Sequence, residues 1–371
     1  MWAIAMDERI RLSVGEPDFP TPAHICEAAR RAMDEGYTRY TPQPGFEDLR
    51  DAVAHKFQTE NGIDARREQI VVSCGGKHSL YNVMRCAVGA GDEVILLQPY
   101  WFAAVEQVRL AGAAPVLVDC PATNDFQPDV DAIGLAISDA TRAIVINSPC
   151  NPTGAVFCRQ TLWAIARIAI EHDLLVITDE VYESMVFDDA EHVSIASLDA
   201  EVASRTVTIN SVSKTHAMTG WRIGYAAMPA RLAEKVTHLQ SVSTSGPCAV
   251  AQRAALAAIT GDQSHVETMV RSYAERREMM LRHLRRVTPV RFAEPQGTFY
   301  VFVDITGLYG RVIGGQMINS ADDLARVARE MSALEILPAT TFGAPHHVRL
   351  SFAVAHADIE RGFERLGRLL A

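Results

Sequence analysis

The chain has 371 residues, of which 45 are acidic and 35 are lysine or arginine, so its formal net charge at pH 7 is -10. This balance argues against a nucleic-acid-binding protein, which would need a basic surface, and no apolar stretch is long enough to cross a bilayer. A chain of this length is more than one small core usually organises, so we expect two domains.

Cysteines, histidines and the first residues bear on location and metal binding. The start lacks the basic segment followed by an apolar segment that marks a signal peptide. The seven cysteines are an odd number without a Cys-x-x-Cys pair, which favours reduced thiols in a cytoplasmic protein over disulfides or a zinc site. His346 and His347 are the only adjacent histidines, and no HExxH pattern accompanies them. We interpret them as loop residues and expect no metal site.

Segments with helical spacing alternate with short apolar runs along most of the chain. The first predicted helix carries Phe46, Leu49, Val53 and Phe57 and ends near Gly62. Apolar runs typical of buried strands cover residues 69–73, 93–97, 115–118, 142–147, 174–178 and 206–210. Further helices are predicted over residues 77–88, 102–110 and 159–171. This alternation predicts an α/β fold with a mostly parallel sheet that helices cover on both faces.

The pattern changes after about residue 261. A long charged helix over residues 267–286 is followed by an apolar run at 299–303, a helix from residue 322 and a strand at 347–352. Such a block is typical of a smaller α+β domain. We expect residues 40–262 to form the large α/β domain, and residues 1–39 together with 263–371 to form the small one.

The turn Cys74-Gly-Gly-Lys77 joins a predicted strand to a predicted helix. Its paired glycines, Gly75 and Gly76, allow the backbone to approach a ligand closely, and a helix N-terminus offers N–H groups and a positive dipole to a phosphate. Alone this signal is weak, because glycines between a strand and a helix usually only form a tight turn. The segment has neither the P-loop spacing nor a GxGxxG pattern, which argues against a nicotinamide-dependent dehydrogenase.

Two further loops follow predicted strands. In Asn147-Ser-Pro-Cys-Asn151-Pro-Thr-Gly154, two prolines and a glycine form a rigid loop that aims the amide of Asn151. Asp179 follows the strand at 174–178, and a buried carboxylate there needs a partner. A protonated ring nitrogen of a cofactor would be one, and Tyr182 lies one helical turn further on. The alternative is that Asp179 is the N-cap of a helix.

The segment Ser211-Val-Ser-Lys214-Thr-His-Ala-Met-Thr-Gly-Trp-Arg222-Ile-Gly224 follows the strand at 206–210. Crevices at the carboxyl ends of strands are where open α/β sheets bind ligands. Lys214 can form a Schiff base with an aldehyde, and Arg222 with the two serines can hold a phosphate. An aldehyde and a phosphate on one small molecule describe pyridoxal phosphate. The segment resembles the lysine motif of class I/II aminotransferases, which are fold type I pyridoxal-phosphate enzymes.

The resemblance extends from Gly15-Glu-Pro-Asp-Phe19 to Arg349-Leu-Ser-Phe352 and is closest to the bacterial aspartate-aminotransferase-like branch. It implies that Lys214 is the Schiff-base lysine and proton shuttle and that Asp179 pairs with the pyridinium. The other cofactor contacts that it implies are Tyr182 and Asn151 at the phenolic oxygen, Trp101 stacked on the ring, and Gly75, Gly76, Lys77, Ser211, Ser213 and Arg222 around the phosphate.

The resemblance also implies how substrate and subunits are arranged. Arg349 would bind the substrate α-carboxylate bidentately, with Gly15, Asn151 and Trp101 beside it. Tyr40, within Tyr-Thr-Pro-Gln-Pro-Gly45, would reach the phosphate of a neighbouring subunit. The implied assembly is a homodimer with shared active sites.

For several of these residues a second role is also compatible with the sequence. Trp101 could be a core aromatic, Tyr40 an ordinary interface residue, and Arg349 a strand arginine paired with a surface carboxylate. Lys77 could point at the phosphate, at a distal carboxylate of the substrate, or at solvent. Only fourteen residues precede Gly15, fewer than the family usually has, so either the sequence starts late or the mouth of the site is remodelled for a different substrate.

The function that the resemblance implies is ping-pong transfer of an amino group between an L-amino acid and a 2-oxo acid. The branch and Lys77 favour aspartate or glutamate, with aromatic or prephenate-type substrates as alternatives. A pyridoxal-phosphate-dependent lyase, cyclase or β/γ-elimination enzyme is a further alternative, as is a non-catalytic pyridoxal-phosphate-binding regulator, because fold and cofactor do not by themselves fix the reaction.

Overall fold

The structure, a computed structural model, describes residues 9–370. Its largest element is a seven-stranded sheet with the spatial order β2 (Ile70–Ser73), β8 (Gly224–Ala227), β7 (Thr206–Ser211), β6 (Leu175–Asp179), β5 (Thr141–Asn147), β3 (Glu93–Gln98), β4 (Ala114–Asp119). Neighbouring strands are parallel except that β8 runs antiparallel to both β2 and β7. The predicted mostly parallel sheet is therefore confirmed.

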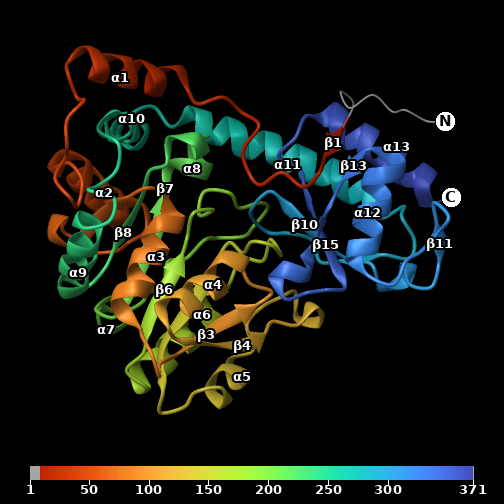
Figure 1. Cartoon of the computed structure of the whole chain (residues 1–371), viewed down its shortest axis with the longest axis horizontal. Coiled ribbons are helices and arrows are strands. Elements are labelled where there is room, and N and C mark those ends of the chain that lie inside the picture. Colours follow the sequence, from red (N-terminus) through yellow and green to blue (C-terminus); the bar gives the residue numbers. More distant parts are fainter. Residues whose placement is uncertain (1–8, 371) are drawn as a thin grey trace.

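Both faces of this sheet are covered by helices (Figure 1). Val94 and Leu96 of β3 belong to the core formed with α3 (Gly76–Ala87), α4 (Phe102–Ala111) and α9 (Ala230–Ser241). Their neighbours Ile95 and Leu97 belong to the opposite core, formed with α5 (Val130–Leu135), α6 (Arg159–Glu171) and α7 (Ala200–Ala203). Because successive strand residues are buried on opposite faces, the strand must be apolar throughout. This explains why the sequence shows continuous apolar runs instead of alternation.

A second lobe contains most of the chain after residue 264 (Figure 1). Its four-stranded sheet has the order β14 (Leu337–Pro338), β15 (His347–Ser351), β10 (Tyr300–Asp304), β9 (Arg291–Phe292), and every neighbouring pair is antiparallel. The short strands β11 (Val312–Ile313) and β12 (Gln316–Met317) form a separate antiparallel pair. The lobe's helices are α12 (Ala321–Ser332) and α13 (His356–Leu370), and the 21-residue α11 (Ser264–Leu284) runs into it from the large lobe.

The N-terminal segment is divided between the lobes. Strand β1 (Ile10–Arg11) pairs in parallel with β13 (Leu334–Glu335), and Ile10 is buried in the core of the small lobe. Helix α1 (Ala23–Asp34), in contrast, packs with α2 (Glu47–Glu60) and α10 (Ala249–Thr260) on the large lobe. Residues 1–39 therefore do not all pack with the small lobe as the sequence led us to expect, and the exact division into two domains stays a prediction.

Two local differences from the sequence-based expectations lie next to the site. Strand β8 was not predicted, because the Gly-Tyr-Ala-Ala segment is short and weakly hydrophobic and directly follows the lysine motif. The residues after Asp179 form a turn and not a helix. The alternative that Asp179 caps a helix is therefore wrong.

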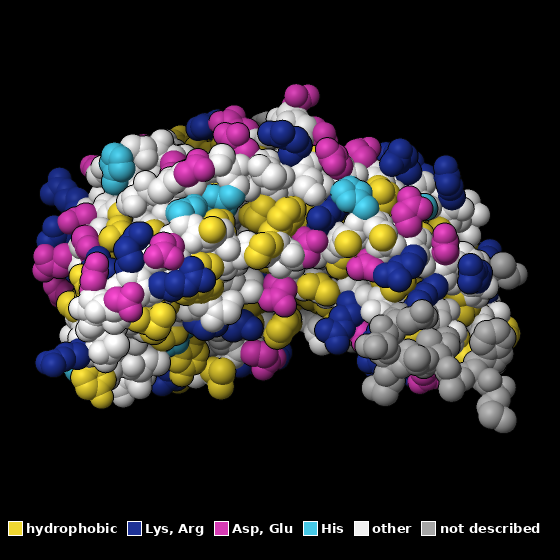
Figure 2. Space-filling model, turned by 90° about the horizontal axis from the view of Figure 1, so that it is seen from above, with side chains coloured by type: hydrophobic (Ala, Val, Ile, Leu, Met, Phe, Trp, Pro, Cys, Tyr) yellow, Lys and Arg dark blue, Asp and Glu magenta, His cyan; other side chains and the backbone are white. Residues whose placement is uncertain are grey.

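Acidic and basic side chains are mixed on the surface of the protein. On the face drawn in Figure 2, Lys and Arg side chains are interspersed with Asp and Glu, and neither sign forms a large patch of its own. Among residues 9–370, no helix combines the length and the apolar character needed to span a membrane.

Candidate functional site

A cavity of about 560 Å³ lies at the carboxyl-terminal edge of the large sheet, with walls from both lobes. Asn147, Asp179 and Ser211 end the adjacent strands β5, β6 and β7, while Tyr300 and Arg349 come from the small lobe. The ends of parallel strands meet at one edge, so residues far apart in sequence converge there. The cavity brings together twelve of the predicted site residues: Gly15, Gly76, Lys77, Trp101, Asn151, Asp179, Tyr182, Ser211, Ser213, Lys214, Arg222 and Arg349.

Two predicted site residues do not line this cavity. Gly75 is the N-cap of α3 with a φ of 94°, and a side chain there would collide with the Arg222 guanidinium. The lack of a side chain at Gly75 therefore leaves room for Arg222, which lines the cavity. Tyr40 is 94% exposed and borders a different hollow, formed by residues 37–41 and 244–250. Within its own chain Tyr40 takes no part in the site.

One end of the cavity is built to hold an anion. The first N–H groups of the 12-residue helix α3 have no acceptor within the helix, and the helix dipole places partial positive charge there. Arg222, in the left-handed conformation with a φ of 57°, donates one N–H to the Thr219 carbonyl at 2.7 Å. Its remaining donors and the hydroxyls of Ser211 and Ser213 line the same cavity. Arginine, hydroxyl and backbone N–H donors are the groups that bind phosphate.

Lys214 extends from α8 (Val212–Thr215), immediately after β7. Its ammonium donates a hydrogen bond to the Gly15 carbonyl. Burial lowers the pKa of Lys214 to about 8, against the attraction of Glu16, and the nearby charges of Arg349 and Arg222 lower it further. A lysine with this pKa has a substantial neutral, nucleophilic fraction near neutral pH.

Asp179 lines the same cavity as Lys214. Burial raises the pKa of the Asp179 carboxyl to about 6, although a hydrogen bond from the Val181 amide and the charge of Lys214 act in the opposite direction. A cationic N–H donor placed against it would favour the ionised form. Asn147 connects the two neighbouring loops. Its side chain donates to the Asp179 backbone carbonyl at 3.0 Å and accepts from the Asn151 backbone N–H at 2.8 Å.

Tyr182 also lines the cavity and is 3% exposed. Its hydroxyl is 2.9 Å from the hydroxyl of Tyr300. Burial, reinforced by the neighbouring Tyr300, raises the pKa of Tyr182 well above its ordinary value. The phenol is therefore neutral at physiological pH and can donate a hydrogen bond into the cavity.

Arg349 lies on β15 and is 5% exposed. It donates to the Asn151 side-chain oxygen at 2.8 Å and to the Ser13 carbonyl at 3.2 Å, and its guanidinium lies 4.0 Å from the Tyr300 ring centre. No carboxylate of the described residues pairs with it, and its buried Nε–H finds no acceptor among them. The alternative of a strand arginine paired with a surface carboxylate is therefore wrong.

The exposed Lys77 also lines the cavity, and its ammonium lies over the ring of Trp101. The Lys77 ammonium lies 4.9 Å from the Trp101 ring centre and 5.4 Å from that of Phe102. Both aromatic residues are at the start of α4 and line the cavity. Trp101 also packs against buried core residues, so it is a core aromatic that keeps one side on the cavity.

Several residues that line the cavity were not predicted from the sequence, among them Asn147, Tyr300, Glu16 and Thr219. Asn147 could have been found, since it ends a predicted strand just as Asp179 does. Tyr300 offered no such sign, because in the sequence it is one more residue of an apolar strand.

One group of described residues has the spacing of metal ligands. Glu180, Glu183 and His192 bring ligand atoms within 4.8 Å of one another. All three are engaged with protein partners, and Lys56 provides a positive charge beside Glu183. The group therefore forms an ion-pair network with its protein partners.

Comparison with known proteins adds to this geometry. The family model described as "Aminotransferase class I and II" matches residues 7–366. An aspartate aminotransferase of Bacillus sp. (strain YM-2) is 39% identical over 361 residues, which are 97% of this chain and 91% of that protein. The chain belongs to the class I and II aminotransferases. It is a pyridoxal-phosphate-dependent enzyme that transfers amino groups, as the sequence had indicated.

Solved structures of other aminotransferases have the same fold. An aspartate aminotransferase from Thermus thermophilus with maleate has a TM-score of 0.92 and 37% identity, covering 97% of this chain and 91% of that chain. An aromatic aminotransferase from Pyrococcus horikoshii also has a TM-score of 0.92 and 37% identity, covering 98% and 96%. The α/β architecture with a smaller second lobe is therefore that of fold type I, and these matches favour amino transfer over a lyase, a cyclase or a regulator.

The residues of this aminotransferase fit pyridoxal phosphate. The anion-binding end suits the phosphate, Lys214 suits the aldehyde, and Asp179 suits a protonated ring nitrogen. Glycine is also required where the phosphate end is most crowded, since a side chain at Gly224 would collide with the backbone of Gly76. The individual contacts to the cofactor stay predictions.

Proposed function

We propose that this aminotransferase acts on dicarboxylic amino acids, aspartate or glutamate, and their 2-oxo acids, with Lys214 as the residue that binds the cofactor and moves the proton. The presence of Lys214, Asp179 and Arg349 in one cavity, with Lys77 as a further cationic side chain, carries this proposal. A bound α-carboxylate at Arg349 would direct the α-carbon toward the amine of Lys214. Names of related proteins support the substrate class, since they include aspartate aminotransferases.

The cofactor, when bound, supplies an aldehyde that holds the amino group and a ring that accepts the electron pair released from the α-carbon. The protein residues orient the substrate and the cofactor and move the proton between them. Lys214 Nζ, with its lowered pKa, would accept the α-proton of the substrate and later give it to the cofactor's aldehyde carbon, on the other side of the nitrogen. A positioned acid–base group of this kind contributes roughly a hundred- to ten-thousand-fold. The ionised Asp179 would keep the ring nitrogen protonated, and the neutral Tyr182 and the Asn151 amide would hold the phenolic oxygen.

The remaining contacts follow from the same cavity. Ser211, Ser213, Arg222 and the α3 N-terminus with Gly76 would surround the phosphate, and Trp101 would stack on the ring. Gly15 would approach the substrate carboxylate, because a side chain added there would lie 3.7 Å from Arg349 Nη2. Lys77, held over Trp101, would bind the distal carboxylate. The relative solved with maleate, a four-carbon dicarboxylate, supports this choice.

A half-reaction measured by absorbance tests the proposed function. Purified, cofactor-loaded protein is mixed with L-aspartate or L-glutamate without any oxo acid. We expect the visible band of the cofactor bound to Lys214 to be replaced by the band of the aminated cofactor, with about one oxo acid released per site, because ping-pong transfer separates into two halves. A band that persists with both amino acids, but disappears with phenylalanine or tyrosine, would contradict the dicarboxylic assignment and favour an aromatic one.

Lys77 allows a sharper test of substrate class. We expect Lys77→Ala to lower kcat/KM for aspartate and glutamate by roughly tenfold to a hundredfold, because a hydrogen bond to a charged group contributes about 1.5–3 kcal/mol. The value for an uncharged amino acid should change little. Lys235→Ala, at an exposed position on α9, is the matched control. An equal loss with every amino acid would show that Lys77 binds the phosphate and not the distal carboxylate.

We also propose a homodimer with a cytoplasmic location. The 94% exposed Tyr40, beside a hollow lined by residues 244–250, supports a contact with a second subunit whose phosphate it would reach. The seven cysteines are all free thiols, which suits a reducing compartment. Sedimentation velocity measures the assembly directly, and a purely monomeric protein would contradict the shared site.

A further inference from the structure

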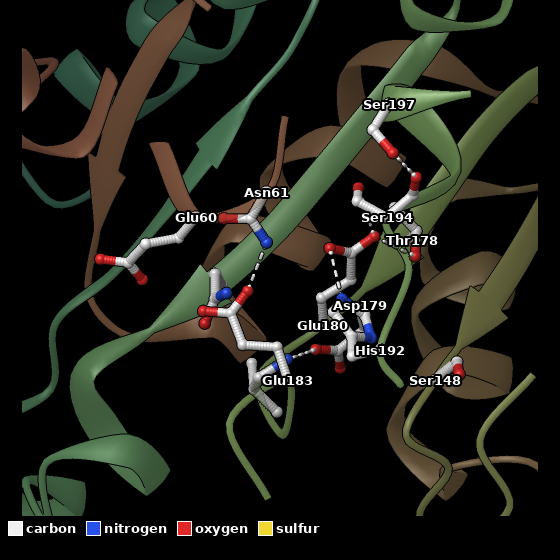
Figure 3. Close-up of polar contacts among 12 residues, drawn as sticks. Glu60, Asn61, Ser148, Thr178, Asp179, Glu180, Glu183, His192, Ser194 and Ser197 are labelled. Carbon is white, nitrogen blue, oxygen red and sulfur yellow. Dashed lines mark hydrogen bonds and ion pairs between the residues drawn. The ribbon is translucent and has the colours of Figure 1, made fainter. Parts of the chain in front are cut away.

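The turn after β6 has one side on the cavity and one side in the protein interior. Asp179, Val181 and Tyr182 line the cavity. The side chains of Glu180 and Glu183 lie on the other side, 1% and 9% exposed. Figure 3 shows Glu183 directed toward Asn61 and Glu180 toward Thr178 and Ser194. Two buried carboxylates therefore lie on the side of the turn that points away from the cavity, next to the residues that line it.

Glu180 is held by three side chains. One carboxylate oxygen accepts hydrogen bonds from Ser194 Oγ at 2.9 Å and Thr178 Oγ1 at 3.1 Å, and the other lies 3.1 Å from His192 Nε2. Burial alone would lower the pKa of His192, but the hydrogen bond and charge of Glu180, together with Glu183, raise it. His192 thus carries positive charge over a wider pH range and offsets the charge of Glu180.

Glu183 is held by a second set of partners on a different element. One of its oxygens forms an ion pair with Lys56 of α2, and the other accepts from the Asn61 side chain at 2.5 Å. Burial would raise the pKa of Glu183, yet Lys56 and His192 outweigh it, and the pKa is lowered. Lys56 is itself 8% exposed and bonded to Asn61 at 2.7 Å. Both members of this ion pair are therefore largely buried and bonded to Asn61 as well.

The backbone of the turn is also held by other bonds. The Glu180 amide donates to the Ile209 carbonyl at 2.9 Å, the Glu183 amide donates back to the Glu180 carbonyl at 2.9 Å, and the Asn147 side chain donates to the Asp179 carbonyl at 3.0 Å. No helix or strand continues past Asp179, and the side-chain bonds of the two glutamates add the contacts that fix the turn from the interior. They tie it to β6 and the 192–194 segment on one side, and to the end of α2 on the other.

We propose that Glu180 and Glu183 are positioning residues for catalysis: by anchoring the turn from the interior, they hold the Asp179 carboxylate and the Tyr182 hydroxyl where the cofactor ring needs them. This inference rests on the proposed role of Asp179. The physical reason is that an error of about 1 Å in a reacting group can cost on the order of a hundredfold in rate. Neither glutamate lines the cavity, so their effect reaches it through Asp179 and Tyr182, by position and, for Glu180, also by the negative charge that raises the pKa of Asp179.

The test is a double-mutant cycle with Glu180→Ala and Asp179→Asn, because coupling between two sites shows as non-additivity. In the wild-type background we expect Glu180→Ala to lower kcat by roughly tenfold to a hundredfold, and the KM of the amino acid to change less than about threefold, since Arg349 is untouched. Cofactor affinity of the apo-protein, followed by fluorescence titration, should weaken in parallel. In the Asp179→Asn background, the same change should add less than about threefold to either loss.

Three further variants complete the design. Glu180→Gln keeps acceptors for the Ser194 and Thr178 hydroxyls, so it should restore most of the rate. Glu60→Ala is the matched control, because Glu60 lies 3.7 Å from the same Lys56 but is 57% exposed and does not touch the turn. Its kcat should equal that of the wild type. Should Glu180→Ala fail to fold, as judged by circular dichroism, Ser194→Ala removes a single bond to Glu180 and enters the same cycle.

The outcomes separate this inference from the proposed function. Equal losses for Glu180→Ala in both backgrounds, or no loss in either, would overturn the positioning role while Asp179 keeps its own. An Asp179→Asn variant as active as the wild type would overturn the proposed role of Asp179 and the positioning role with it. A large loss that disappears in the Asp179→Asn background is the result expected.

Discussion

Replacing Lys214 by alanine is expected to abolish turnover, with a loss of roughly ten-thousand-fold, the upper end of what a positioned acid–base group contributes. The reason is that no second lysine takes its place: among the described residues Lys77 is the only other lysine that lines the cavity, and its ammonium lies over the ring of Trp101. The variant should also lack the visible band of a cofactor held by a lysine. Lys214→Ala turning over at the wild-type rate would refute the assignment of the whole site.

The pKa of Lys214 adds a pH dependence to this prediction. Only the neutral amine adds to an aldehyde, and the neutral fraction grows as the pH rises through the pKa of about 8. Capture of the cofactor by the apo-protein should therefore accelerate from pH 6 to about 8 and level off above that value. Stopped-flow absorbance measures this rate. An unchanged rate between pH 6 and 9 would show that the burial and the arginine charges do not act on Lys214 as inferred.

Replacing Arg349 by alanine is expected to lower kcat/KM for every α-amino acid, chiefly through KM. A hydrogen bond to a charged group contributes about 1.5–3 kcal/mol, so the loss should be roughly tenfold to a hundredfold. The change would also leave the Asn151 side chain without the donor that now lies 2.8 Å away. Arg349→Lys should remain impaired, since lysine keeps the charge but not the planar pair of donors.

Steady-state kinetics with aspartate, glutamate and an aromatic amino acid measures the Arg349 effect. Arg291→Ala is the matched control, because Arg291 lies in the same small-lobe sheet but is exposed and outside the cavity. A loss confined to one class of amino acid would show that Arg349 reads a side chain and not the α-carboxylate.

Much of the large lobe could be predicted because its strands are buried on both faces. A fully buried stretch of strand is apolar at every position, so runs such as residues 143–146 stand out from the helices between them. Strand β8, which was not predicted, is buried at every position as well, but it is short and weakly hydrophobic, since Gly224 opens it and two alanines end it. Its place in the sheet depends on contacts with β2 and β7 that no local pattern records.

The candidate site was predictable for a similar reason. Asp179, Asn151 and Lys214 each follow a recognisable strand, and strand ends of a parallel sheet converge at one edge. Tyr300 and Glu180 could not be found in this way. Tyr300 lies within an apolar strand, and Glu180 matters only through partners at positions 178, 192 and 194, which the fold brings to it.

The sequence by itself determined the class of chemistry, because a lysine, an arginine, an aspartate and serines directly after apolar strands specify the groups that a pyridoxal-phosphate enzyme needs. Only the tertiary structure decided which of these groups share one cavity, that Tyr40 lies outside it, and that two buried glutamates stand behind Asp179. The physical reason is the distance along the chain over which the interactions act. Residue type and spacing report local structure and chemistry, whereas burial, pKa and charge pairing depend on neighbours that are distant in the chain.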